Sequence, residues 1–232
     1  MIKLEHVSKS YTAGIPALND VSLDIEEGEF VFIVGDSGSG KSTLIKVLTG
    51  VYEKDDGQIF VEGNDKEVSI RSPQDAQRLG ISTVYQEITL CPNLSVAENM
   101  YIGRTENIYQ DWKKMNADAD KLLRSLDIPA KATQQLAACS IAVQQMVAIA
   151  RAVDMDCKVL ILDEPTSSLD EQEVEKLFTL MRDLRSRGVG IIFVTHFLDQ
   201  VYEVCDKITV LRDGKLVGQY EIKDLPRVKL VA

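Results

Sequence analysis

The sequence predicts an α/β protein with a mostly parallel central sheet, an antiparallel β section at the N-terminal end and a helical segment inserted in the middle. Three observations predict this fold class. Apolar and polar residues alternate through much of the first 25 positions, as in strands with one buried face. Short continuous apolar runs at 30–34, 159–162 and 190–194 are typical of strands buried on both faces. Between 87 and 155, helical patterns replace the strand patterns.

The remaining elements can be placed in chain order around these runs. A turn-rich piece at 11–16 divides the first two strands, and Asp213-Gly214 predicts a hairpin turn near the end. Further strands are expected at 57–63, 80–84 and 207–211, and helices at 41–49, 117–126, 140–153 and 171–187, with a capping box at Ser95–Glu98.

This order of elements predicts how the chain is organised. We expect one domain over residues 1–232, without internal repeats. Residues 1–86 and 156–232 are expected to form the α/β core with its β subdomain, and residues 87–155 a helical subdomain.

Composition and charge exclude several classes of protein. Acidic residues outnumber Lys and Arg by 36 to 26, and the net charge of −10 argues against a general nucleic-acid binder. The four cysteines, at 91, 139, 157 and 205, form no Cys-x-x-Cys pair that would suggest zinc or redox chemistry. The sequence shows neither the roughly 20 continuous apolar residues of a membrane span nor a secretory signal. We therefore expect a cytoplasmic protein that can still dock onto a membrane protein.

The strand at 30–34 leads directly into a glycine-rich loop with the full G-x-x-x-x-G-K-[ST] spacing. Glycines let successive backbone N–H groups converge on phosphate oxygens, and the following helix presents its positive dipole end to the same anion. Lys41 would contact the β- and γ-phosphates, and the Ser42 hydroxyl would bind Mg²⁺. The strand–loop–helix context disfavours a chance glycine-rich turn, so the motif predicts binding of ATP with Mg²⁺. The predicted loop reads Gly35-Asp36-Ser37-Gly38-Ser39-Gly40-Lys41-Ser42-Thr43.

Two further apolar strands end in residues suited to phosphoryl transfer. Asp163 follows the run at 159–162 and is placed to hold a Mg²⁺-bound water; the alternative is a residue that caps the next helix. Glu164 comes next and could orient or deprotonate the attacking water. His196 follows the strand at 190–194 and could contact the γ-phosphate; the alternative is a structural hydrogen bond.

Over essentially its whole length, the sequence resembles an ABC ATPase cassette, a RecA-like P-loop NTPase. The order of motifs carries the resemblance: the P-loop, Gln86 after a strand, a serine-led signature, Asp163-Glu164, Ser168-Leu169-Asp170 and His196. It implies that Gln86 touches Mg²⁺ and water and relays to a membrane partner. It also implies that Tyr11 stacks on adenine, with an ordinary turn tyrosine as the alternative.

The signature departs from the family pattern Leu-Ser-Gly-Gly-Gln. The sequence here is Cys139-Ser140-Ile141-Ala142-Val143, which keeps the serine that caps a helix and loses both glycines. Side chains at these positions could narrow the approach to the γ-phosphate of a partner subunit. Together with Gln144-Gln145-Met146-Val147 and the 84–87 and 94–99 segments, the signature is similar to the first cassette of bacterial ribose-, xylose- and galactose-type importers.

The resemblance implies the partners and the reaction. ATP hydrolysis would drive import of a monosaccharide through separate transmembrane permease subunits, at the inner face of the cell membrane. Two cassettes would close head to tail, as a homodimer or as tandem domains, and Ser140 of each would complete the ATP site of the other. A periplasmic or extracellular sugar-binding protein would be an indirect partner. The alternatives are a transport ATPase for another cargo, such as nucleosides, and a soluble ABC ATPase outside transport.

Overall fold

The computed structural model describes residues 1–12, 14–62, 66–86, 89–104, 111–195 and 197–224. Strands in these ranges form a three-stranded sheet in the order β2-β1-β4 and a six-stranded sheet in the order β5-β6-β7-β3-β8-β9. The strands are β1 (Ile2–Thr12), β2 (Ile15–Ile25), β3 (Phe30–Val34), β4 (Asp56–Val61), β5 (Ile81–Val84), β6 (Val159–Asp163), β7 (Gly190–Val194), β8 (Lys207–Arg212) and β9 (Lys215–Glu221).

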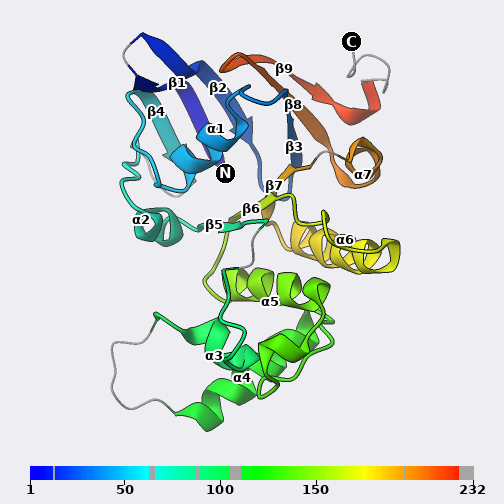
Figure 1. The fold of residues 1–232 in the computed structure, drawn as a ribbon. Helices are drawn as coiled ribbons and strands as arrows, with labels where there is room; N and C mark the ends of the chain where they lie inside the picture. The colour runs from blue at the N-terminus through cyan, green and yellow to red at the C-terminus, as the bar shows by residue number, and fades with distance from the viewer. Residues whose placement is uncertain (13, 63–65, 87–88, 105–110, 196, 225–232) are drawn as a thin grey trace.

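Helices cover the sheets and form a separate group at one end. Figure 1 shows α3, α4 and α5 together at the end of the molecule opposite the three-stranded sheet. The helices are α1 (Lys41–Leu48), α2 (Pro73–Arg78), α3 (Val96–Tyr101), α4 (Trp112–Ser125), α5 (Ile141–Val153), α6 (Glu171–Ser186) and α7 (Leu198–Val204), with 3₁₀ turns η1 (Leu136–Ala138) and η2 (Ile222–Asp224).

The centre of the six-stranded sheet is parallel and buried on both faces. β3 pairs in parallel with β7 and β8, and β6 pairs in parallel with β5 and β7. Phe30 and Phe32 face one apolar cluster, which includes residues of α5 and α6. Val31 and Ile33 face the other, which includes residues of α1 and of the three-stranded sheet. A strand covered on both faces needs apolar residues at every position, which explains the continuous apolar runs in the sequence.

This arrangement confirms the predicted fold class: a mostly parallel core sheet, an antiparallel N-terminal sheet and an inserted helical segment. The predicted strands at 30–34 and 190–194 match β3 and β7 residue for residue, and the capping box of α3 lies at Ser95 and Glu98 as predicted. The β8–β9 hairpin turns at Asp213-Gly214, both with positive φ, as predicted. The division at residues 86/87 and 155/156 stays a prediction.

Two features of the sequence were interpreted wrongly or missed. The turn-rich piece expected at 11–16 is too long, because β1 continues to Thr12 and β2 starts at Ile15. The short helices α2 and α7 were not predicted, since six or seven residues are too few to show helical periodicity. In the described ranges, no helix combines the length and the apolar character needed to cross a membrane.

Candidate active site

The loop between β3 and α1 is packed so closely that two of its glycines have no room for a side chain. A Cβ at Gly35 would collide with the Leu211 carbonyl oxygen and the Ser39 hydroxyl. Gly40 has φ of +104°, and a Cβ there would lie 2.8 Å from the Ala17 carbonyl oxygen. The loop is therefore held between β2 and the β8–β9 hairpin, and the Gly214 N–H donates to the Ser39 carbonyl at 3.0 Å.

The N-terminus of α1 opens toward this loop without a side-chain cap, because its N-cap residue is Gly40. The first turn of α1 also holds no acidic residue. The leading N–H groups of a helix have no partner inside the helix, and together with the helix dipole they favour an anion. The start of α1 is thus suited to bind phosphate oxygens.

The Lys41 ammonium lies over the same loop. It donates to the carbonyl oxygens of Gly35 and Asp36, the latter at 3.0 Å, and to Ser39 Oγ at 3.3 Å. Burial lowers the pKa of Lys41, and the carboxylates of Asp36, Glu164 and Asp163 oppose that shift. The ammonium therefore lies between the phosphate loop and the acidic residues at the end of β6.

Asp163 and Glu164 are positioned by the pairing of β6 with β7. Asp163 is the last residue of β6 and pairs with Val194 at the end of β7. The helix that follows is capped by Asp170, so the alternative role of Asp163 as a helix cap is excluded. Glu164 has φ of +48°, a left-handed conformation that is unfavourable for residues with a Cβ. Such strain clusters at functional sites.

One cavity of about 390 Å³ brings most of the predicted site residues together. It connects the end of β1, the glycine-rich loop and the ends of β6 and β7. Asp163, Glu164 and Lys41 all line it. Its lining residues are Tyr11, Ala17, Ser37, Gly38, Ser39, Gly40, Lys41, Ser42, Thr43, Asp163, Glu164 and Val194.

Tyr11 lies at the end of β1, not in a turn, and lines this cavity beside the phosphate loop. Its side chain is 54% exposed, and its hydroxyl lies 3.0 Å from Thr43 Oγ1 in α1. An exposed aromatic ring beside a phosphate-binding loop offers a flat apolar face for the base of a nucleotide.

Five of the predicted residues lie elsewhere or cannot be placed. Gly35 and Asp36 belong to the loop but do not line the cavity. Gln86 follows β5 and is exposed, and it is not among the lining residues. Ser140 caps α5, where its hydroxyl accepts from the Val143 N–H at 3.4 Å. His196 lies outside the described residues.

Ser140 is separated from the cavity of its own chain by the fold. Its helix, α5, packs against β5, α3, α4 and α6, while α1 packs against β2. Figure 1 shows α5 at the edge of the helical group and α1 beside the three-stranded sheet. Ile141, in place of a family glycine, is 49% exposed next to Ser140. The start of α5 therefore faces outward, available to another molecule.

The residues at the cavity fit a Mg²⁺ ion that is bound together with a nucleotide. Mg²⁺ prefers oxygen ligands and keeps several waters, binding through one or two protein groups plus phosphates. The Ser42 hydroxyl and the Asp163 carboxylate line the same cavity and supply this donor set. Among the described residues that line the cavity, the groups able to bind a metal are oxygen donors, and oxygen donors match a hard cation.

Sequence reasoning missed two residues that line the cavity. Ala17 and Val194 contribute to its wall, although neither has a side chain with recognisable chemistry. Val194 could have been inferred as the last residue of a strand that was predicted correctly. Ala17 carries no such signal, because its place beside Gly40 depends on how β2 crosses the loop.

Fold and site together define a P-loop nucleotide-binding protein. Comparison with known proteins makes this class more specific. The family model described as ABC transporter matches residues 18–167, about two thirds of the chain. The chain belongs to this family.

Named relatives and solved structures agree with this family. The chain is 50% identical over its full length to the galactofuranose transporter ATP-binding protein YtfR of Escherichia coli (strain K12), covering 46% of that protein. It is 47% identical over 94% of its length to the fructose import ATP-binding protein FruK of Bifidobacterium longum, covering 43% of it. The ADP conformation of MJ1267, an ATP-binding cassette of an ABC transporter, superposes with a TM-score of 0.86 at 25% identity, covering 100% of this chain and 98% of that one. The chain spans about half the length of the relatives it matches.

Proposed function

We propose that this chain is an ATP-hydrolysing cassette that energises import of a monosaccharide. The observation that carries the proposal is the single cavity that contains the glycine-rich loop, Asp163, Glu164 and Tyr11. The sugar-import names of the relatives support the choice of cargo.

The proposed reaction is attack of water on the γ-phosphorus of ATP, with cleavage of its bond to the β–γ bridging oxygen. The N–H groups at the start of α1 and the Lys41 ammonium hold the phosphate oxygens and stabilise the charge on them. Glu164 accepts the proton of the attacking water. Ser42 and Asp163 would hold Mg²⁺, which when bound would neutralise charge on the phosphates. The family resemblance assigns Gln86 to water positioning, and the place of His196 after the strand at 190–194 of the sequence assigns it to γ-phosphate contact.

A second cassette is required to complete the site. The described lining of the cavity comes from the end of β1, from β2, from the glycine-rich loop and from the ends of β6 and β7, and Ser140 is not part of it. An outward-facing helix N-terminus is suited to bind the γ-phosphate held by another cassette. The solved structure of MJ0796 bound to ADP and Pi, with a TM-score of 0.78, is described as dimeric. ATP would then favour the closed pair of cassettes because the nucleotide contacts both of them. Hydrolysis of the ATP would let the two cassettes separate.

The substitution Glu164→Gln tests the reaction and the pairing together. Removing the base but keeping the shape should abolish phosphate release while preserving ATP-dependent dimers in sedimentation velocity. Ser140→Trp should block those dimers without changing ATP binding to the monomer, since Ser140 is exposed and outside the cavity. Normal hydrolysis by Glu164→Gln would exclude Glu164 as the base, and ATP-dependent dimers of Ser140→Trp would exclude the head-to-tail arrangement.

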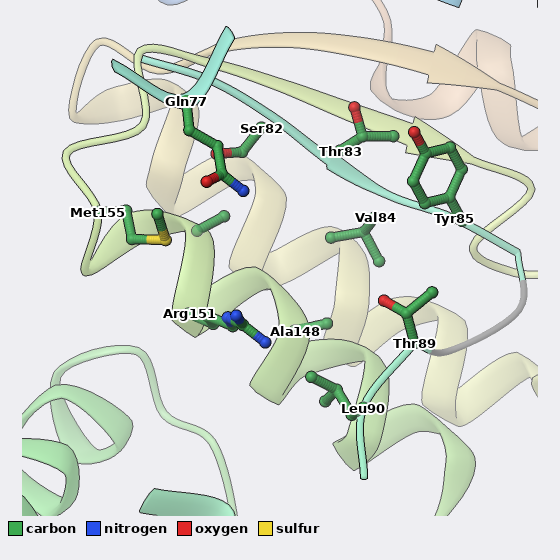
Figure 2. A pocket seen from close by; sticks show the side chains of 11 residues that line it. Gln77, Ser82, Thr83, Val84, Tyr85, Thr89, Leu90, Ala148, Arg151 and Met155 are labelled. Atoms are coloured by element: carbon green, nitrogen blue, oxygen red, sulfur yellow. The ribbon is translucent and has the colours of Figure 1, made fainter. Parts of the chain in front are cut away.

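A cavity beside Gln86 supports docking of a permease at the inner face of a membrane. This cavity, of about 200 Å³, lies between β5 and α5 (Figure 2), and its lining includes Tyr85, the residue before Gln86 in the sequence, and Thr89. Ala148 and Arg151 of α5 form part of its wall. A segment inserted here would contact both Tyr85, just after β5, and α5, the helix that Ser140 caps. Such a segment could link the membrane partner to the ATP site, and an extracellular or periplasmic sugar-binding protein would act through that partner.

Filling this cavity tests the docking proposal. Ala148→Trp should prevent co-purification of the permease from membranes of the source cells, while the ATPase rate of the isolated chain stays unchanged. A matched control is Lys121→Trp, an exposed position on α4 away from the cavity. Retention of the permease by Ala148→Trp would show that docking occurs elsewhere. Sugar uptake assays in cells that lack this chain would then identify the cargo.

A further inference from the structure

The segment between α1 and β4 contacts β1 at the three residues that precede Tyr11. The Asp55 carboxylate accepts from the Lys9 ammonium and from the Ser10 N–H, both at 2.6 Å. The Asp55 N–H donates to the Ser8 carbonyl at 2.8 Å. The hydrogen bond from Lys9 lowers the pKa of Asp55, so this carboxylate is charged at neutral pH. The end of β1 is therefore fixed to a segment that belongs to neither β1 nor β2.

Tyr52 of the same segment touches the Tyr11 ring itself. The two ring centroids lie 5.2 Å apart with an interplanar angle of 73°, an edge-to-face contact. This geometry is the favourable one for two aromatic quadrupoles. Because the hydroxyl of Tyr11 is also held near Thr43, the ring has contacts at its edge and at its tip.

Tyr52 is itself anchored on α1. Its N–H donates to the Lys46 carbonyl at 3.0 Å, and the Lys46 ammonium lies 5.4 Å from the centre of its ring. Its side chain packs against the buried cluster that includes Leu44 and Leu48. Since α1 also presents the phosphate loop, Tyr52 connects the ring of Tyr11 to the helix that binds the phosphates.

We propose that Tyr52 is a positioning residue that holds the Tyr11 ring in place for the base of the nucleotide, with Asp55 as a second support. The proposal rests on the proposed function, which assigns Tyr11 to the base. A half-exposed tyrosine without such contacts would lose rotamer freedom when a base stacks on it. A ring that is already fixed avoids that loss, so the contact raises affinity through preorganisation.

Loss of the Tyr52 contact should weaken binding of the base of ATP and leave binding of the phosphates unchanged. Dissociation constants for ATP and for tripolyphosphate, both with Mg²⁺, can be measured by calorimetry. Tyr52→Leu should weaken ATP binding about three- to tenfold and leave tripolyphosphate binding unchanged. Tyr52→Phe keeps the ring and should bind ATP as the native chain does. Tyr220→Leu, at an exposed tyrosine of β9, is the matched control and should change neither constant.

A double substitution tests whether Tyr52 acts through Tyr11. Tyr11→Leu should weaken ATP binding, and adding Tyr52→Leu should cause no further loss, because the ring to be positioned is gone. Asp55→Asn, at a side chain that is 46% exposed, provides a second variant that should fold and should weaken ATP binding selectively.

Each outcome bears on a different claim. Unchanged ATP binding in Tyr11→Leu would overturn the assignment of Tyr11 to the base, and with it the proposed function of that residue. Weakened binding in Tyr11→Leu with unchanged binding in both Tyr52→Leu and Asp55→Asn would overturn the positioning role alone. An equal loss of ATP and tripolyphosphate affinity in Tyr52→Leu would also overturn it, because such a loss reports general damage to α1.

Discussion

The backbone N–H of Glu164 donates a hydrogen bond to the Val194 carbonyl at 2.8 Å. The bond continues the β6–β7 pairing one residue beyond Asp163, the last residue of β6. It holds Glu164 at the rim of the cavity while φ at that residue is +48°. The position of the proposed base is thus set by the sheet, against the local preference of the backbone.

This backbone strain predicts an unusual order of stabilities at position 164. Glycine adopts positive φ freely, whereas a residue with a Cβ does so at a cost of about 1 kcal/mol. Glu164→Gly should therefore be more stable than Glu164→Ala by about 1 kcal/mol in urea unfolding. At Glu171, in the first turn of α6, the order should reverse, because glycine weakens helices. Greater stability of Glu164→Ala would show that the strain is not present in solution.

The close packing of the phosphate loop predicts different effects at two of its glycines. Gly35→Ala would place a Cβ against the Leu211 carbonyl oxygen, which is backbone and cannot rotate away. Gly38→Ala meets nothing within 4 Å, although its φ of +83° adds strain of about 1 kcal/mol. We expect Gly35→Ala to abolish ATP binding and Gly38→Ala to weaken it about tenfold or less. Equal affinities in a calorimetric titration would contradict this order.

An ion pair fixes the ends of α3 and α5 together in the helical group. Arg104, just after α3, contacts Asp154 at 2.5 Å and donates to the Arg151 carbonyl at 2.7 Å. Because the Arg104 side chain is only 16% exposed, Arg104→Met should lower the free energy of unfolding by about 2 kcal/mol.

A more exposed arginine serves as the control for this pair. Arg182 contacts Glu175 and Glu203 on the surface, with its side chain 41% exposed. Arg182→Met should cost only about 0.5 kcal/mol, since water screens exposed charges. A similar fall in the free energy of unfolding in both variants, measured by urea unfolding, would mean that burial of Arg104 does not strengthen its ion pair.

Burial of the Cys157 thiol predicts loss of stability in alkali. Burial raises its pKa from an ordinary value of 9.0 to about 11. A thiol whose pKa is higher when folded contributes stability that is present below pH 9 and is lost as the pH rises to 11. The loss should total about 3 kcal/mol.

The difference between the native chain and Cys157→Ala isolates this effect. The free energy of unfolding of the native chain should fall by this amount between pH 9 and 11. Cys157→Ala should not show this fall. Cys91→Ala should still show the fall, because Cys91 is exposed. An identical pH dependence for the native chain and Cys157→Ala would contradict a buried, protonated thiol.

The success of sequence analysis depended on how local each signal was. The run at 30–34 followed by Gly35–Thr43 predicted a strand, loop and helix because strand burial and glycine spacing are local properties. Gln86 and Ser140 were named from resemblance, and the structure places neither of them in the cavity of this chain. Helices α2 and α7 escaped detection because short helices depend on tertiary packing.

The sequence by itself determined the fold class, the phosphate loop and the acidic residues that follow a buried strand. It did so because continuous apolar runs and glycine spacing leave few alternatives for the backbone. Only the tertiary structure decided which residues meet. Parallel pairing brings Asp163 beside Val194, and the segment after α1 brings Tyr52 against Tyr11, 41 positions away in the chain. Such contacts depend on how distant elements pack, and no local pattern of residues encodes that packing.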